Sequence, residues 1–134
     1  MKIALKGTNG KYVCAEENEN FPVVVNRGVL GPWEKFTVEV VGLSTAGNQI
    51  IALKAESNNK YVRLERDTYE LKPDRNVIGP DEKYEVIWDG TNKLSLKAAN
   101  DFYAGDFTAN HDVLLAKATA VGPEEIFEVE IVSF

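Results

Sequence analysis

Gly31-Pro32-Trp33-Glu34-Lys35-Phe36 is the stretch that decides the fold, because its pattern returns twice along the chain. The two recurrences are Gly79-Pro80-Asp81-Glu82-Lys83-Tyr84 and Gly122-Pro123-Glu124-Glu125-Ile126-Phe127. A Gly-Pro pair marks a turn, since Gly tolerates positive φ and Pro fixes φ. Three such turns, roughly 45 residues apart, predict a threefold internal repeat. If Gly79 adopts positive φ, its replacement by Ala should destabilise the protein.

Each predicted repeat contains four short segments with the alternating pattern of a β-strand, and no segment has a useful helical period. The chain of 134 residues therefore reads as a single all-β domain, residues 1–134, with repeats at about 1–47, 48–91 and 92–134. A four-stranded unit repeated three times fits a closed β-trefoil with pseudo-threefold symmetry better than a propeller, which needs more than three blades. Six strands would form a barrel, and three hairpins would cap one end.

Equivalent apolar positions in the three repeats predict the core. They alternate along their strands, so they share one face. The predicted core trios are Ile3, Ile51 and Leu94; Leu5, Leu53 and Leu96; Phe36, Tyr84 and Phe127; Val38, Val86 and Val129; and Val40, Trp88 and Ile131. Trp88 is accordingly expected to be buried. Trp33 is expected to be partly exposed, because its counterparts Asp81 and Glu124 are charged.

Composition excludes several classes of partner. The net charge of −6 and the pI of about 4.8 weigh against nucleic acid and anionic membranes, which need clustered Lys and Arg. No run approaches the roughly 18 apolar residues of a membrane span. The first residues are too polar for a signal peptide, so we expect a cytoplasmic protein if the chain is complete, and an extracellular one if it is a module of a secreted enzyme.

The chain lacks the motifs of common catalytic and cofactor sites. Its one Cys and one His, Cys14 and His111, allow no disulfide and no ordinary zinc site. No glycine-rich phosphate loop or nucleophile elbow occurs. Most carboxylates fall at outward strand positions or in loops. We therefore expect no enzyme activity, no metal and no cofactor, and we interpret Cys14 as a small buried hydrophobe.

Residues 11–16, 24–27 and 31–36 together resemble the fascin-like β-trefoil family. That resemblance extends along the chain and implies a binding module. Members include actin-bundling fascins, histidine-rich hisactophilins, and modules attached to microbial polysaccharide-degrading enzymes. The single histidine argues against the hisactophilins, and the absence of Gln-x-Trp argues against ricin-like lectins.

The favoured function is non-catalytic binding of a polysaccharide or glycan by a monomer, and the alternative is an F-actin-binding or cytoskeletal scaffold domain. Sugar sites often stack an exposed aromatic ring on a pyranose, with a few polar groups fixing its orientation. Residues that break the threefold pattern are the best candidates. One platform combines Trp33 with Asn26 and Arg27, and Tyr69 is a further loop aromatic. The second platform, in the third repeat, comprises Asp106, Phe107, Asn110 and His111.

The glutamate of the repeated turn is interpreted differently. Glu34, Glu82 and Glu125 recur in all three copies, so an architectural role is favoured over ligand binding. We expect their carboxylates to accept hydrogen bonds from amides of the turn.

Overall fold

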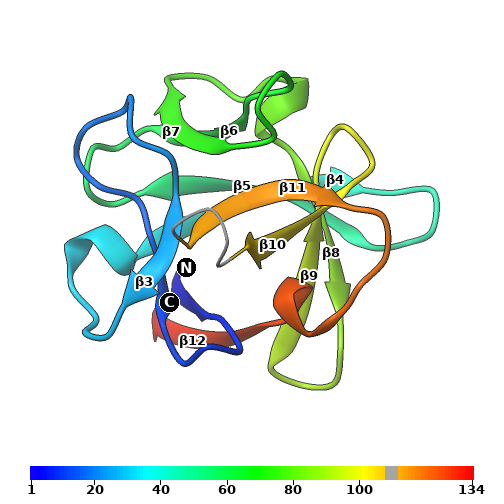
Figure 1. The fold of residues 1–134 in the computed structure, drawn as a ribbon. Helices are drawn as coiled ribbons and strands as arrows, with labels where there is room; N and C mark the ends of the chain where they lie inside the picture. Colours follow the sequence, from blue (N-terminus) through cyan, green and yellow to red (C-terminus); the bar gives the residue numbers. More distant parts are fainter. Residues whose placement is uncertain (108–111) are drawn as a thin grey trace.

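The computed structural model describes residues 1–107 and 112–134, except for the side chains of residues 106 and 107. Twelve strands and three short 3-10 helices lie in this described part of the chain (Figure 1). The strands are β1 (Lys2–Lys6), β2 (Tyr12–Cys14), β3 (Val24–Arg27), β4 (Phe36–Leu43), β5 (Gln49–Ala55), β6 (Tyr61–Leu64), β7 (Leu71–Arg75), β8 (Tyr84–Trp88), β9 (Lys93–Lys97), β10 (Tyr103–Phe107), β11 (Val113–Ala118) and β12 (Phe127–Ser133). The helices are η1 (Pro32–Glu34), η2 (Pro80–Glu82) and η4 (Pro123–Glu125).

Six strands form a closed ring. Antiparallel pairing runs from β1 to β4, β5, β8, β9 and β12, and β12 pairs with β1 again. Closure leaves no exposed sheet edge around this ring. The predicted all-β class and the predicted closed barrel are thus confirmed.

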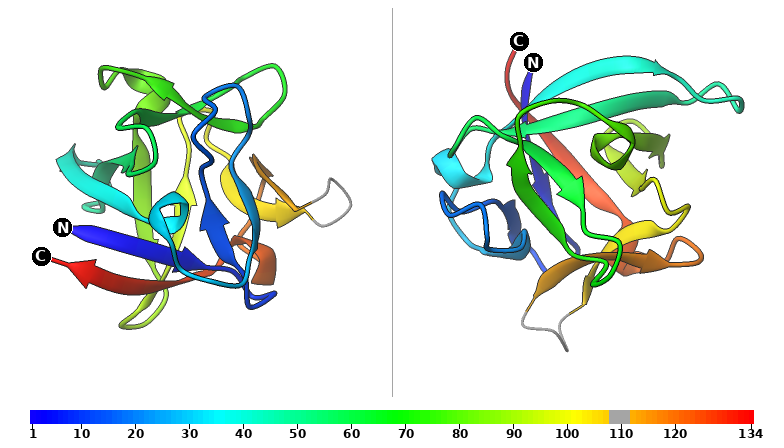
Figure 2. Two further views of the ribbon diagram at one scale, coloured as in Figure 1. Left: turned by 90° about the vertical axis from the view of Figure 1, so that its left-hand side faces the viewer. Right: turned by 90° about the horizontal axis from the view of Figure 1, so that it is seen from above.

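The remaining strands form three hairpins, β2–β3, β6–β7 and β10–β11, which cover one end of the barrel. Backbone hydrogen bonds tie the hairpins together: Val23 N donates to Leu71 O at 2.8 Å, and Leu114 N donates to Val23 O at 2.9 Å. Both views in Figure 2 place the two chain ends side by side, on the opposite side of the barrel from β10 and β11. The barrel therefore has a capped end and an open end.

The core fills the barrel between these ends. Phe36, Tyr84 and Phe127 are the largest fully buried side chains, as their alternation predicted. The two aliphatic trios of β1, β5 and β9 are buried as well. Cys14 lies fully buried, as expected of a small hydrophobe.

The outermost predicted trio is not part of the core. Val40, Trp88 and Ile131 are 58 %, 50 % and 53 % exposed, so the prediction that Trp88 is buried is wrong. Each is the fifth residue of its strand, β4, β8 or β12, where alternation still directs it towards the barrel axis. Among the described residues no further layer covers them at the open end, and so the same pattern that buries Phe36 leaves Trp88 in contact with solvent.

The three Gly-Pro turns share one geometry. Each begins a 3-10 helix whose glutamate is buried and accepts a hydrogen bond from the glycine amide: Glu34 from Gly31 at 2.6 Å, Glu82 from Gly79 at 2.6 Å, and Glu125 from Gly122 at 2.8 Å. This is the architectural role expected from the repetition. Gly79, however, has φ −113° rather than positive φ. Glycine suits this position for another reason: a Cβ there would lie 2.9 Å from Glu82 Oε1.

Candidate functional site

The platform predicted around Trp33 does assemble. The guanidinium carbon of Arg27 lies 5.4 Å from the centroid of the Trp33 ring, a cation–π distance. Arg27 Nε donates to Asn26 Oδ1 at 3.0 Å. Arg27, at the end of β3, and Trp33, in η1, are thus brought together by the turn that separates them.

Glu16 completes the group, and sequence reasoning missed it. Its Oε2 accepts a hydrogen bond from Arg27 Nη2 at 2.6 Å in an ion pair. Glu16 lies two residues after the end of β2, which pairs with β3 in a hairpin. In the β2–β3 register Arg27 lies opposite Tyr12 rather than Glu16, so no cross-strand pattern in the sequence points to this contact.

Local backbone geometry separates Trp33 from Glu34. Successive residues of a 3-10 helix point about 120° apart, so neighbours face different directions. Glu34 turns inward and is buried, whereas Trp33 stays half-exposed, as its charged counterparts predicted. The carbonyl of Trp33 accepts a hydrogen bond from Ala15 N at 2.8 Å, which fixes η1 against the end of β2.

An open hollow of about 400 Å³ lies at this position. Its lining comprises Arg27, Gly28, Val29, Gly31, Pro32, Trp33 and Glu34. An indole, a guanidinium and small apolar groups therefore meet at one surface depression. This composition matches a ligand site that is mainly apolar with a few oriented polar groups.

Cys14 lies beneath this region but is not poised for chemistry. Burial, followed by a hydrogen bond with Glu34, raises the pKa of the Cys14 thiol to about 12. A thiol with such a pKa is protonated near neutral pH, and the thiolate is the reactive form. Cys14 is therefore a structural residue under the hollow.

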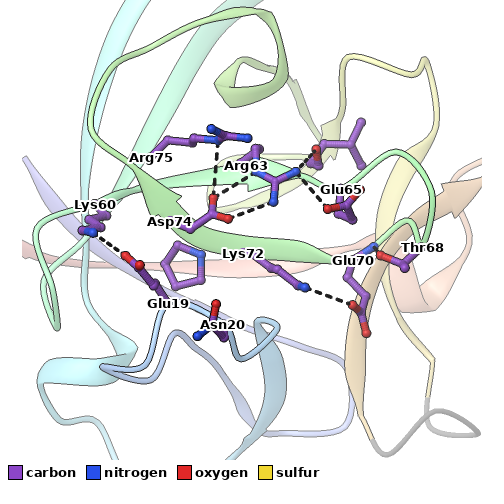
Figure 3. Close-up of polar contacts among 12 residues, drawn as sticks. Glu19, Asn20, Lys60, Arg63, Glu65, Thr68, Glu70, Lys72, Asp74 and Arg75 are labelled. Carbon is purple, nitrogen blue, oxygen red and sulfur yellow. Dashed lines mark hydrogen bonds and ion pairs between the residues drawn. The ribbon is translucent and has the colours of Figure 1, made fainter.

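The equivalent region of the second predicted repeat is occupied by ion pairs (Figure 3). Asp74, the counterpart of Asn26, binds Arg63 through two contacts of 2.8 and 3.0 Å. This hydrogen bonding with Asp74 is the main cause of the raised pKa of Arg63. Asp81, the counterpart of Trp33, pairs with Arg66 at 2.7 Å. This region thus offers a satisfied charge network instead of an aromatic ring.

The third predicted repeat has a hollow of about 410 Å³ at the matching place. No aromatic side chain is among its lining residues, which are Lys117, Ala118, Thr119, Ala120, Pro123, Glu124 and Glu125. Of the second predicted platform, Asp106 and Phe107 end β10, paired with Leu114 and Val113. Asn110 and His111 lie outside the described residues. The second platform therefore stays a prediction.

Tyr69 does not line the hollow at Trp33. It has positive φ of 65° and lies in the turn between β6 and β7. Its ring centroid lies 6.3 Å from that of Phe102, and its carbonyl accepts a hydrogen bond from Ala116 N. Tyr69 is therefore associated with the β10–β11 hairpin rather than with Arg27 and Trp33.

Within residues 1–107 and 112–134, no group of three or more His, Cys, Asp and Glu is placed to hold a metal ion. The same part of the chain contains no helix of the length and apolarity that crossing a membrane requires.

Comparison with solved structures defines the class of fold. A designed threefold-symmetric protein, ThreeFoil, superposes with a TM-score of 0.81 at 12 % identity, covering 98 % of this chain and 99 % of its own. A Polyporus squamosus lectin, solved with the epitope Neu5Acα2-6Galβ1-4GlcNAc, gives 0.78 at 9 % identity, covering 96 % of this chain and 48 % of its own. An endo-β-galactosidase from Clostridium perfringens gives 0.77 at 14 % identity, with 98 % and 33 % covered.

These similarities show that the fold is that of β-trefoil proteins. The chain spans about half of the lectin and a third of the hydrolase, so it matches one part of each. No protein-family model and no curated sequence matches the chain. Membership of the fascin-like family therefore stays a prediction. Fold alone does not assign a ligand, so function has to be argued from the site.

Proposed function

We propose that this protein is a non-catalytic carbohydrate-binding module whose site is the hollow at Trp33. The half-exposed Trp33 ring, held over an open depression, is the observation that carries the proposal. Indole offers a flat apolar surface that stacks on the C–H face of a pyranose. The lectin and hydrolase neighbours support this class of ligand, because both carry a trefoil of this shape.

Arg27 and the polar groups bonded to it suit a sugar's hydroxyls. The side chains of Arg27 and Glu16 are 34 % and 27 % exposed, and their ion pair holds both in place. Asn26 accepts from Arg27 Nε through its side-chain oxygen, which leaves its amide NH₂ to donate to a ligand. Donors and acceptors fixed before binding lower the entropic cost of orienting the sugar.

We also infer three four-stranded repeats, at residues 1–47, 48–91 and 92–134. A turn asparagine that bonds a strand carbonyl occurs at the equivalent place in each repeat and supports this division. Asn9, Asn58 and Asn100 each donate from Nδ2 to a strand carbonyl, on Val25, Pro73 and Ala116, at 2.9–3.0 Å. On this division Trp33 occurs in one repeat only, so each chain has one indole site. An F-actin partner stays a prediction, which none of the neighbours described above supports.

Tryptophan fluorescence tests the proposed site. Trp88 is exposed and Trp33 is partly exposed, so the Trp88→Phe variant is used to make Trp33 the sole reporter. Titration with soluble β-glucan and with galactose- and GlcNAc-terminated oligosaccharides should change its emission for at least one glycan. Affinity electrophoresis should then show that Trp33→Ala abolishes retention by that glycan, and that Val77→Ala, an exposed change outside the hollow, leaves it intact.

Two outcomes would contradict the proposal. One is the absence of any response of Trp33 across the panel. The other is glycan retention that survives Trp33→Ala, which would instead favour the platform that includes Phe107 and His111. Salt-sensitive pelleting with actin filaments would support the alternative function.

A further inference from the structure

The open end of the barrel carries an apolar groove that the proposed sugar site does not use. The groove has a volume of about 300 Å³ and is lined by twelve residues. Eleven of these are apolar, and the twelfth is Gln49. Val40, Trp88, Ile131, Met1 and Phe134 form its exposed part.

The exposed area of this surface is at the upper end of what a monomer normally leaves in water. From their exposed fractions, Met1, Val40, Trp88, Ile131 and Phe134 together present on the order of 600 Å² of mostly apolar area, against about 300–600 Å² for the largest patch of a typical monomer. One partner of a standard interface contributes about 800 Å². The groove and the residues at its rim therefore approach the area of one side of a protein–protein contact.

The chemistry of the groove favours a second copy of this chain as the partner. None of its twelve lining side chains is charged, so two copies can meet without burying a charged side chain. Trp88 lies at the groove, and half of its large apolar side chain is exposed to solvent. Trp is strongly enriched among residues that dominate interface energetics.

We propose that the protein forms a twofold-symmetric dimer through this groove, with Trp88 of each copy packing into the groove of the other. A twofold axis uses the same patch on both copies, so one self-complementary surface is enough. The two barrels would then meet open end to open end. The dimer replaces the monomer expected from the sequence, and it does not depend on the proposed glycan function.

The dimer has a consequence for binding. The groove shares no lining residue with the hollow at Trp33, so dimerisation leaves that hollow free. Each dimer would carry two copies of the hollow. Because each chain has a net charge of −6, salt should strengthen association by screening repulsion between the copies.

Sedimentation equilibrium over about 1 μM to 1 mM tests the dimer. The wild-type protein should approach twice the chain mass of 14.9 kDa as its concentration rises. Ile131→Glu and Trp88→Gln should each weaken dimerisation at least tenfold, because they place a polar group in the contact. Val77→Glu is the matched control: Val77 is also strongly exposed but does not line the groove, so its dimer should persist.

A second measurement follows the groove directly. In Trp33→Phe the only indole is Trp88, whose emission should shift to shorter wavelength as dimer forms. Circular dichroism verifies that each variant is folded. A wild-type protein that stays monomeric throughout the range overturns the proposal, as does a dimer unaffected by both groove variants. A monomer whose groove instead takes up an apolar dye or another protein also overturns it.

Discussion

Gly105 lies so close to Glu125 that a Cβ at position 105 would overlap the Glu125 carboxylate. That carboxylate cannot easily move, because it is buried and hydrogen-bonded to the Gly122 amide. We expect Gly105→Ala to lower the free energy of unfolding by about 1–3 kcal/mol, as overpacking does. Urea denaturation measures this loss. Gly42→Ala is the control, since a Cβ there meets no atom within 4 Å; equal losses would contradict the close contact.

Glu125 itself should contribute to stability through its turn. Glu125→Ala removes the acceptor of the Gly122 amide, and an unsatisfied amide costs roughly 1–3 kcal/mol. Thermal or urea unfolding tests this. Glu124→Ala, one residue earlier, removes an exposed carboxylate and should change stability by less than about 0.5 kcal/mol. A larger effect at Glu124 than at Glu125 would reverse the assigned roles.

The barrel core should be sensitive to truncation. Leu53 is buried in β5, so Leu53→Ala should cost on the order of 2–5 kcal/mol from lost transfer energy and the cavity left behind. Thr37→Ala, at a half-buried position on β4, should cost well under that. Urea melts of the two variants provide the comparison. Similar losses would mean that the assignment of inward and outward strand positions is wrong.

Cys14 should be unreactive in the native protein. Burial is the main cause that raises its pKa from 9.0 to about 12, so the folded state holds the thiol proton more tightly than the unfolded state. The stability linked to this proton is complete below pH 9 and is lost as the pH rises towards 12. Ellman's reagent at about pH 8 should label Cys14 only after denaturation. Fast labelling of the folded protein would show that Cys14 is accessible.

The comparison of Trp33 with Trp88 shows where sequence reasoning succeeds. Partial exposure of Trp33 was predictable, because charged residues at the two equivalent positions indicate a solvent-facing place. The same logic failed for Trp88. Its counterparts Val40 and Ile131 are apolar, yet all three lie beyond the last buried layer. An alternating apolar pattern predicts which side chains point towards the barrel axis. Burial also requires that other residues pack over those side chains.

The site shows a similar division. Asn26, Arg27 and Trp33 could be found from the sequence because they depart from the threefold pattern and lie close together in the chain. Glu16 could not, because it lies beyond β2 and its side chain reaches Arg27 although the strand register places Tyr12 opposite Arg27. In the second predicted repeat, Arg66 and Asp81 are 15 residues apart and still form a pair, which no local pattern reveals.

By itself, the sequence determined the all-β class, the three Gly-Pro turns and most of the core. These follow from local turn chemistry and from a period of two, both of which act between near neighbours in the chain. Only the tertiary structure decided that β1 and β12 close the barrel, that Glu16 pairs with Arg27, and that Trp88 borders an uncovered groove. Each of these depends on contacts between segments far apart in sequence, or on the absence of a covering layer.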